Sequence, residues 1–239
     1  MLAKMIDKIV SLKETKIFEV DGHTYADKEL SLVEYRLSPA RVNFSSLDAI
    51  CKMVRREIKE LGNLGKTLFI CVDRYNEVSV YTTYDESFRR MFLYVSKADA
   101  PGLTEGWRSI DKALIELRSL CIQTDGSTKL VDTLSHINFD EGMEIRDNGI
   151  CQEVKVKSGV SLNYMAKVEP RVELQPFRTF LEVEQPSSEF IVRVDKSKGV
   201  GFFEADGGIW KLEAKKNIAN YFKTYLSDMI ERGEVVVIQ

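Results

Sequence analysis

The sequence predicts a mixed α+β fold, with an α/β N-terminal half and a strand-rich C-terminal half capped by one long helix. In the first half, amphipathic helical patterns alternate with apolar runs that are typical of buried strands. From Met143 onward, short alternating runs follow one another between Gly, Ser and Pro residues, and a helical pattern begins near Trp210. The expected regions are residues 1–100, a helical connection over 101–140 and a strand-rich region over 141–239, which can pack as one compact domain.

The N-terminal region is expected to hold a hairpin, a capped helix and a group of apolar strands. Asp21-Gly22 stands between two alternating runs and is a strong signal for a two-residue hairpin turn. Ser45 and Ser46 can cap the following helix, and Gly62 is a natural stop for it. The expected elements are a helix within 1–12, strands over 16–20, 23–25 and 32–35, a helix over 47–61, and strands over 66–72, 78–83 and 91–95.

The remaining regions follow a break at 98–102, where Pro101 and Gly102 interrupt the pattern. Apolar residues at helical spacing then predict two helices, over 110–120 and 130–137. Beyond them, an alternation with a period of two predicts short strands, a long helix and a closing strand. The strands are expected over 143–146, 152–157, 172–174, 179–183, 190–194, 200–204 and 235–238, and the helix over 210–232.

Composition and charge exclude several classes of protein. The 239 residues include 34 Lys and Arg against 37 Asp and Glu, a net charge of -3, whereas general nucleic-acid binders usually carry a basic excess. No stretch approaches the roughly 18 apolar residues that span a bilayer, and the start carries too many charges for a signal peptide. The four cysteines never form C-x-x-C and have apolar neighbours, so we expect free buried thiols and a reducing cytoplasm.

Histidine offers little for catalysis or metal binding in this sequence. Only His23 and His136 occur, and neither has a partner at metal-ligand spacing. The nucleophile-elbow pattern G-x-S-x-G is missing, as are the Walker A and G-x-G-x-x-G patterns. We therefore expect neither a zinc site nor a Ser-His-Asp triad.

Acidic residues form a stronger cluster in the second half. In the predicted strands, Glu182 and Glu184 share one face, as do Glu204 and Asp206 further along, so four carboxylates could converge on Mg²⁺. The favoured interpretation is that they face water or pair with basic residues. Asp206-Gly207-Gly208 could form an anion-binding turn at a helix start, but a tight turn capped by Asp206 is favoured. The basic residues considered as partners are Arg178, Arg193 and Lys211.

A segment over 74–94 interleaves aromatic and basic side chains. Such a surface suits nucleotides or single-stranded nucleic acid, because bases stack on aromatic rings beside positive charge. Packing of several of these rings in the core is the favoured alternative. The residues are Arg74, Tyr75, Tyr81, Tyr84, Phe88, Arg89, Arg90, Phe92 and Tyr94.

Three segments, 147–160, 176–190 and 202–214, carry a resemblance to known sequences. They resemble a family of uncharacterised, YfdQ-like proteins from tailed phages and prophages, and the likeness extends more loosely over most of the chain. The resemblance implies a phage origin and a gene among early or recombination genes, and it implies no established activity. Within these segments, Arg178 suits a partly buried ion pair, and Phe190 with Trp210 would bury apolar area between the sheet and the last helix.

These observations predict a cytoplasmic phage protein that self-associates and binds a host factor or a nucleotide-type ligand, without catalysis. Edge strands such as 235–238 offer surfaces for symmetric assembly. One alternative is a nucleic-acid-binding accessory factor in phage recombination. Another is a Mg²⁺-dependent hydrolase; otherwise no cofactor and no membrane partner are expected. The candidate ligand or interface residues are Arg74, Tyr75, Arg89, Arg90, Arg178, Glu182, Glu184, Glu204, Asp206, Trp210 and Lys211.

Overall fold

The computed structural model of the chain describes residues 17–20, 23–26, 41–61, 67–84, 90–137, 144–147, 152–158 and 162–239. By their internal contacts, residues 1–39 and residues 40–239 form two separate units. The expected helix within 1–12, the expected strand at 32–35 and the expected helix stop at Gly62 lie outside the described residues.

The first unit contains the predicted hairpin. β1 (Ile17–Val20) pairs antiparallel with β2 (His23–Ala26), and Val20 stands opposite His23. Two residues, Asp21 and Gly22, therefore connect the strands, which is the loop length for which Asp-Gly is preferred. The hairpin prediction is confirmed.

The second unit contains a five-stranded sheet in the order β15-β4-β5-β6-β3, called here the first sheet. β4 (Leu68–Arg74), β5 (Glu77–Tyr84) and β6 (Arg90–Lys97) form an antiparallel meander at the three predicted apolar runs. β15 (Val235–Ile238) pairs parallel with β4, and β3 (Val42–Phe44) pairs parallel with β6. The last strand of the chain thus joins a sheet built from its first half.

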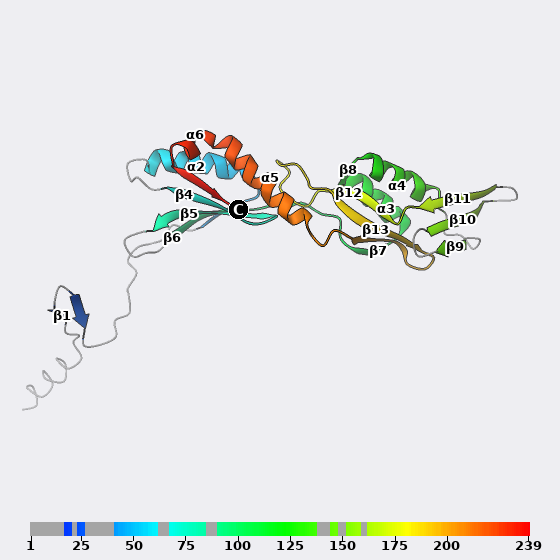
Figure 1. Ribbon diagram of the computed structural model, residues 1–239, viewed down its shortest axis with the longest axis horizontal. Helices are drawn as coiled ribbons and strands as arrows, with labels where there is room; N and C mark the ends of the chain where they lie inside the picture. The colour runs from blue at the N-terminus through cyan, green and yellow to red at the C-terminus, as the bar shows by residue number, and fades with distance from the viewer. Residues whose placement is uncertain are drawn as a thin grey trace, which may run out of the picture. The chain divides into compact units, whose positions relative to one another are not determined.

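Three helices, α2 (Leu47–Leu61), α5 (Trp210–Tyr225) and α6 (Ser227–Glu231), cover one face of the first sheet (Figure 1). Ser46 caps α2 as predicted, because its hydroxyl accepts a hydrogen bond from the backbone N–H of Ala49 at 3.2 Å. Buried residues of the helices and strands form a common core, among them Ile50, Val54, Leu68, Ile70, Ile218 and Phe222.

The structure corrects two expectations about the C-terminal helix. The helix does not cap the strand-rich half, because Ile218, Phe222 and Met229 belong to the core of the first sheet. It is also interrupted, since α5 ends before Leu226 and the short α6 follows. Helical spacing shows which side of a helix is apolar, but it carries no information about which sheet that side will meet.

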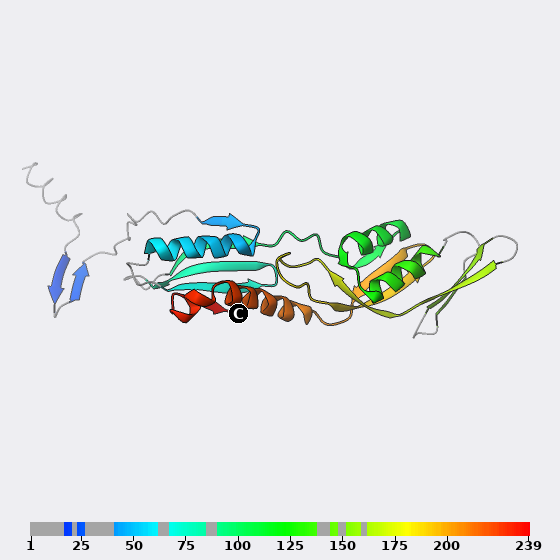
Figure 2. The same cartoon turned by 90° about the horizontal axis from the view of Figure 1, so that it is seen from above.

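The strand-rich half forms a second sheet in the order β7-β14-β13-β12-β8, with antiparallel pairs throughout. Two helices, α3 (Ile110–Ser119) and α4 (Asp125–Ser135), pack over it (Figure 2). Alternate residues of β13, from Phe190 to Val194, are buried in its core, as a period of two requires. The strands are β7 (Gly106–Arg108), β8 (Cys121–Ile122), β12 (Arg171–Pro176), β13 (Ser188–Asp195) and β14 (Gly199–Glu204).

A further antiparallel sheet consists of β9 (Glu144–Asp147), β10 (Gln152–Ser158) and β11 (Leu162–Val168). Val154 and Val168 from this sheet join the core of the second sheet. The short strands β3, β7 and β8 were not predicted, because strands of two or three residues carry no periodic signal. β11, which has seven residues, was also not predicted. The helices and sheets together confirm the mixed α+β class.

Two connecting segments run between the parts that hold the first and second sheets, and a loop of the second sheet reaches the core of the first. Residues 98–105, which include the predicted break at 98–102, run from β6 to β7, and residues 205–209 run from β14 to α5. The loop over 177–187 joins β12 to β13 and places Phe180 in the core of the first sheet. Among the described residues, no helix is long and apolar enough to cross a membrane.

Candidate ligand-binding site

The candidate site lies where these connecting segments meet, and its central residue is Arg178. Arg178 follows β12 and is 8% exposed. Its Nη1 donates a hydrogen bond to Glu204 Oε1 at 2.7 Å, and its Nη2 donates to Ser188 Oγ at 2.6 Å and to the Pro186 carbonyl at 3.3 Å. Arg178 therefore forms a buried ion pair, with Glu204 on β14 as its partner.

Trp210, the first residue of α5, lies against the guanidinium group of Arg178. The central carbon of that group is 3.8 Å from the centroid of the indole ring. The indole Nε1 donates to Glu204 Oε2 at 3.2 Å, so both oxygens of this carboxylate are engaged. Tyr75, in the turn between β4 and β5, meets the indole edge to face at 4.8 Å between centroids. Residues from both sheets thus fix the orientation of Trp210.

Asp206 closes the same cluster and caps the turn before α5. One carboxylate oxygen accepts a hydrogen bond from Ser188 Oγ at 2.7 Å, and the other accepts from the Gly208 N–H at 2.9 Å. Desolvation alone would raise the pKa of Asp206. These hydrogen bonds, a further one from the backbone N–H of Trp210, and the charge of Arg178 hold that pKa below its usual value. The geometry supports the capped-turn interpretation of Asp206-Gly207-Gly208, because the Asp206 carboxylate already occupies the place where an anion would bind.

Four of these residues, Tyr75, Arg178, Glu204 and Trp210, line a cavity of about 240 Å³. Its wall combines aromatic and aliphatic side chains with polar groups. We refer to it as the Arg178 cavity, and it is lined by Tyr75, Asn76, Ala98, Ala100, Pro101, Gly102, Leu103, Arg178, Glu204 and Trp210.

One polar atom of Arg178 lacks a partner. Its Nε is shielded from solvent and forms no hydrogen bond with any described residue. Burial lowers the pKa of Arg178, but Glu204 and Asp206 oppose this effect, and a guanidinium stays charged at neutral pH. A buried donor without an acceptor costs about 1–3 kcal/mol. Because native proteins leave few such groups unsatisfied, this atom singles out the Arg178 cavity as the candidate site.

Gln185 holds the loop that carries Arg178, and its role was not predicted. The residue is 3% exposed. Its Oε1 accepts hydrogen bonds from the N–H groups of Arg178 and Thr179 at 3.0 and 3.1 Å. Its Nε2 donates to the carbonyls of Phe180 and Val183 at 2.8 and 3.2 Å. A single side chain therefore replaces the strand hydrogen bonds that this loop does not make.

The prediction of a strand over 179–183 is wrong, so Glu182 and Glu184 do not share a strand face that could bring the four acids together. Residues 180–183 turn instead, with the N–H of Val183 bonded to the carbonyl of Phe180. Glu182 reaches the start of α2, and Glu184 is exposed, whereas Glu204 and Asp206 belong to the Arg178 cluster. The described residues contain no group of three or more His, Cys, Asp and Glu side chains placed to hold a metal ion.

The aromatic and basic residues predicted over 74–94 do not form one surface in the structure. Tyr75 lines the cavity, Arg74 is exposed at the end of β4, and the buried Tyr94 donates its hydroxyl hydrogen to Glu57. Arg89 and the side chain of Arg90 lie outside the described residues. Of the candidate residues, the structure brings together Tyr75, Arg178, Glu204, Asp206, Trp210 and Lys211, whose Nζ is 5.6 Å from the Trp210 ring.

Glu182 is expected to stabilise α2 rather than to bind a ligand. Its Oε1 accepts a hydrogen bond from the Leu47 N–H at 2.8 Å, at the positive end of the helix. We expect Glu182→Ala to lower the free energy of unfolding by about 1 kcal/mol. The matched variant Glu184→Ala should change it by less than about 0.5 kcal/mol, because among the described residues only the backbone carbonyl of Glu184, and not its carboxylate, accepts a hydrogen bond. Urea unfolding of both variants checks this, and equal effects would contradict the capping role.

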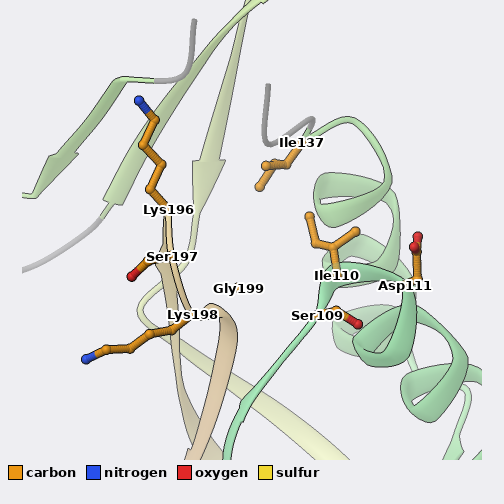
Figure 3. A pocket seen from close by; sticks show the side chains of 8 residues that line it. All are labelled: Ser109, Ile110, Asp111, Ile137, Lys196, Ser197, Lys198 and Gly199. Atoms are coloured by element: carbon orange, nitrogen blue, oxygen red, sulfur yellow. The ribbon is translucent and has the colours of Figure 1, made fainter. Parts of the chain in front are cut away.

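A larger cavity, of about 510 Å³, lies between the start of α3 and the turn from β13 to β14 (Figure 3). Figure 3 shows the side chains of Lys196 and Lys198 pointing away from Ser109 and Ile110. Ser109 is already used as the cap of α3, and Asp195 accepts the N–H groups of Ser197 and Lys198. We therefore place the candidate site at the Arg178 cavity, because the Nε of the buried Arg178 has no hydrogen-bond acceptor among the described residues.

The buried thiols are poor nucleophiles. Burial raises the pKa of Cys51 to about 12 and the pKa of Cys121 to about 11, from the usual 9.0. Both therefore remain protonated at neutral pH, and the thiolate, which is the reactive form, is scarce. The free-thiol expectation holds for Cys51, Cys71 and Cys121, while Cys151 lies outside the described residues.

The raised pKa values of Cys51 and Cys121 predict that the protein loses stability at high pH. The folded chain holds both protons more tightly than the unfolded chain, so their stabilising effect is complete below about pH 9 and is lost as the pH rises through the folded pKa values. We expect the free energy of unfolding to fall above about pH 9, and to fall less steeply in Cys51→Ala. Urea unfolding across that range measures both slopes; identical slopes would contradict the prediction.

No protein-family model, curated protein or solved structure matches the chain. The functional argument therefore rests on the geometry of the site itself.

Proposed function

We propose that this chain is a binding protein without catalytic activity, and that its ligand occupies the Arg178 cavity. The observation that carries the proposal is the buried guanidinium in the cavity wall, whose Nε has no acceptor among the described residues. A ligand acceptor that forms a hydrogen bond with this N–H would remove the cost of leaving it unsatisfied.

The engagement of the Glu204 and Asp206 carboxylates within the protein supports a binding role. Within the described part of the chain, both oxygens of Glu204 accept hydrogen bonds from Arg178 and Trp210, and both oxygens of Asp206 accept from Ser188 and Gly208. A general base needs a carboxylate or imidazole that can reach a substrate proton. The two carboxylates instead organise the wall that a ligand would meet.

The proposal includes a phage or prophage origin, action in the bacterial cytoplasm, and self-association, with a host factor as a further partner. The origin is supported by the sequence resemblance over 147–160, 176–190 and 202–214. Self-association is supported by β15, which lies at the edge of the first sheet with Val236 40% and Ile238 45% exposed. An exposed apolar edge strand offers unpaired backbone groups to a second strand.

Native mass spectrometry of the full chain purified from bacteria tests the proposal. We expect an oligomer that carries a small additional mass for each chain, and we expect this mass to be released on denaturation. A monomer would contradict self-association.

Two leucine variants locate the additional mass. Ala100→Leu adds bulk inside the Arg178 cavity without removing a polar group, whereas Asp99→Leu puts the same side chain at an adjacent position that does not line it. We expect Ala100→Leu to lose the mass and Asp99→Leu to keep it. A mass retained by both variants would place the ligand elsewhere and overturn the proposed site.

A further inference from the structure

The size of the Arg178 cavity limits its ligand. Its volume of about 240 Å³ lies below the roughly 300–1,000 Å³ typical of sites for drug-sized molecules. One flat ring system with small substituents fits such a space. A ring that also carries a sugar and several phosphates would extend beyond it.

The charges around the cavity disfavour an anion. The cations are Arg178 and Lys211, and the anions are Glu204, Asp206 and Glu105, whose Oε1 accepts the Glu204 N–H at 2.7 Å. The charged groups around the cavity are therefore three negative and two positive. Both terminal nitrogens of Arg178 are already bonded within the protein, and the N–H of Gly208 is bonded to Asp206. An added phosphate or carboxylate would meet net repulsion and few free donors.

The polar atoms of the wall suit the edge of a heterocyclic base. Arg178 Nε needs one acceptor, which a ring nitrogen or a carbonyl oxygen supplies. Asn76 also lines the cavity, and its amide can both donate and accept. Tyr75 and Pro101 provide apolar and aromatic surface against which a flat ring can lie.

From size, charge and donor pattern together, we infer that the ligand of the Arg178 cavity is a free, uncharged nucleobase or nucleoside rather than a phosphorylated nucleotide. This inference rests on the proposed binding function and narrows its ligand class. Arg178 can contact such a ligand without an anionic group on the ligand, because Glu204 already balances the charge of Arg178.

Isothermal titration calorimetry with the full chain tests the inference. The probes are adenine, uracil, adenosine and uridine, compared with AMP, UMP and inorganic phosphate. We expect at least one base or nucleoside to bind about tenfold or more tightly than its monophosphate. Its affinity should stay unchanged between about 50 and 500 mM NaCl, because screening does not act on an uncharged ligand.

Two variants show whether binding occurs at this site. Arg178→Lys keeps the positive charge but removes the Nε donor, and we expect it to weaken binding about tenfold or more. Ala100→Leu should abolish binding and Asp99→Leu should not; this pair decides the matter if Arg178→Lys fails to fold.

The outcomes separate the inference from the proposed function. Tighter binding of a monophosphate or of phosphate, weakened by salt, would overturn the nucleobase inference and leave the binding site in place. A retained mass in native spectra without binding of any base or nucleoside would also overturn the inference alone. If no probe binds and no mass is retained, the proposed function fails as well.

Discussion

Replacing Gln185 with alanine is expected to lower the free energy of unfolding by about 3–5 kcal/mol. The change leaves two N–H groups, of Arg178 and Thr179, and two carbonyls, of Phe180 and Val183, without their partner. Gln185 itself is 3% exposed, so water reaches these groups only if the loop opens. The same opening would withdraw Phe180 from the core of the first sheet, which adds an apolar cost to the polar one.

Gln175→Ala provides the matched control for this variant. The Gln175 side chain donates one hydrogen bond, from Nε2 to the Gln185 carbonyl at 2.6 Å, and it is only partly buried. Its loss should cost about 1 kcal/mol. Urea unfolding followed by tryptophan fluorescence reports on both variants, because Trp210 lies beside the loop. If Gln185→Ala is no more destabilising than Gln175→Ala, the loop does not depend on this residue.

Local sequence signals predicted the elements whose structure depends on local interactions. Asp21-Gly22 marked the first hairpin, Ser46 marked the start of α2, and three apolar runs marked the β4–β6 meander. In each case, the residues that carry the signal also make the stabilising contact, either a turn, a cap or a buried strand face.

The loop over 177–187 shows where such signals fail. Residues 181–184 alternate apolar and acidic side chains as a strand does, yet Leu181 is 68% exposed while its neighbour Phe180 is buried with the first sheet. The outcome depends on distant partners, namely the core of the first sheet and the Tyr75 carbonyl, to which Thr179 donates. A periodic pattern describes which residues share a face, but it does not say what that face will meet.

The candidate site was predicted only in part, because its residues also meet through distant partners. Glu204 was singled out by the strand face it was expected to share with Asp206, Arg178 as a candidate for a partly buried ion pair, and Trp210 as a large apolar residue of the last helix. Their pairing requires β14, α5 and the loop to meet at the junction of two sheets, which the sequence does not encode locally. The sequence marked Gln185-Pro186 as a turn, but the four hydrogen bonds of the Gln185 side chain were not predicted, because their backbone partners come together only in the folded loop.

Breaking the ion pair between Arg178 and Glu204 is expected to be the other large effect. The two side chains are 7% and 22% exposed, so removing one leaves the other charge poorly compensated. We expect Arg178→Leu and Glu204→Leu each to lower the free energy of unfolding by about 3 kcal/mol or more. In a double-mutant cycle, the coupling energy should be about 1.5–3 kcal/mol, because the double variant removes both charges together.

The pair Arg171–Glu189 is a control of the same geometry in a different environment. Its Nη1–Oε2 distance is also 2.7 Å, but its side chains are 60% and 42% exposed. The coupling energy of this pair should be below about 1 kcal/mol, because water screens an exposed ion pair. The difference between the two cycles therefore measures the shielding around Arg178. If both couplings are equally small, water reaches the Arg178 guanidinium, its Nε is not deprived of a partner, and the case for a ligand in the cavity loses its main support.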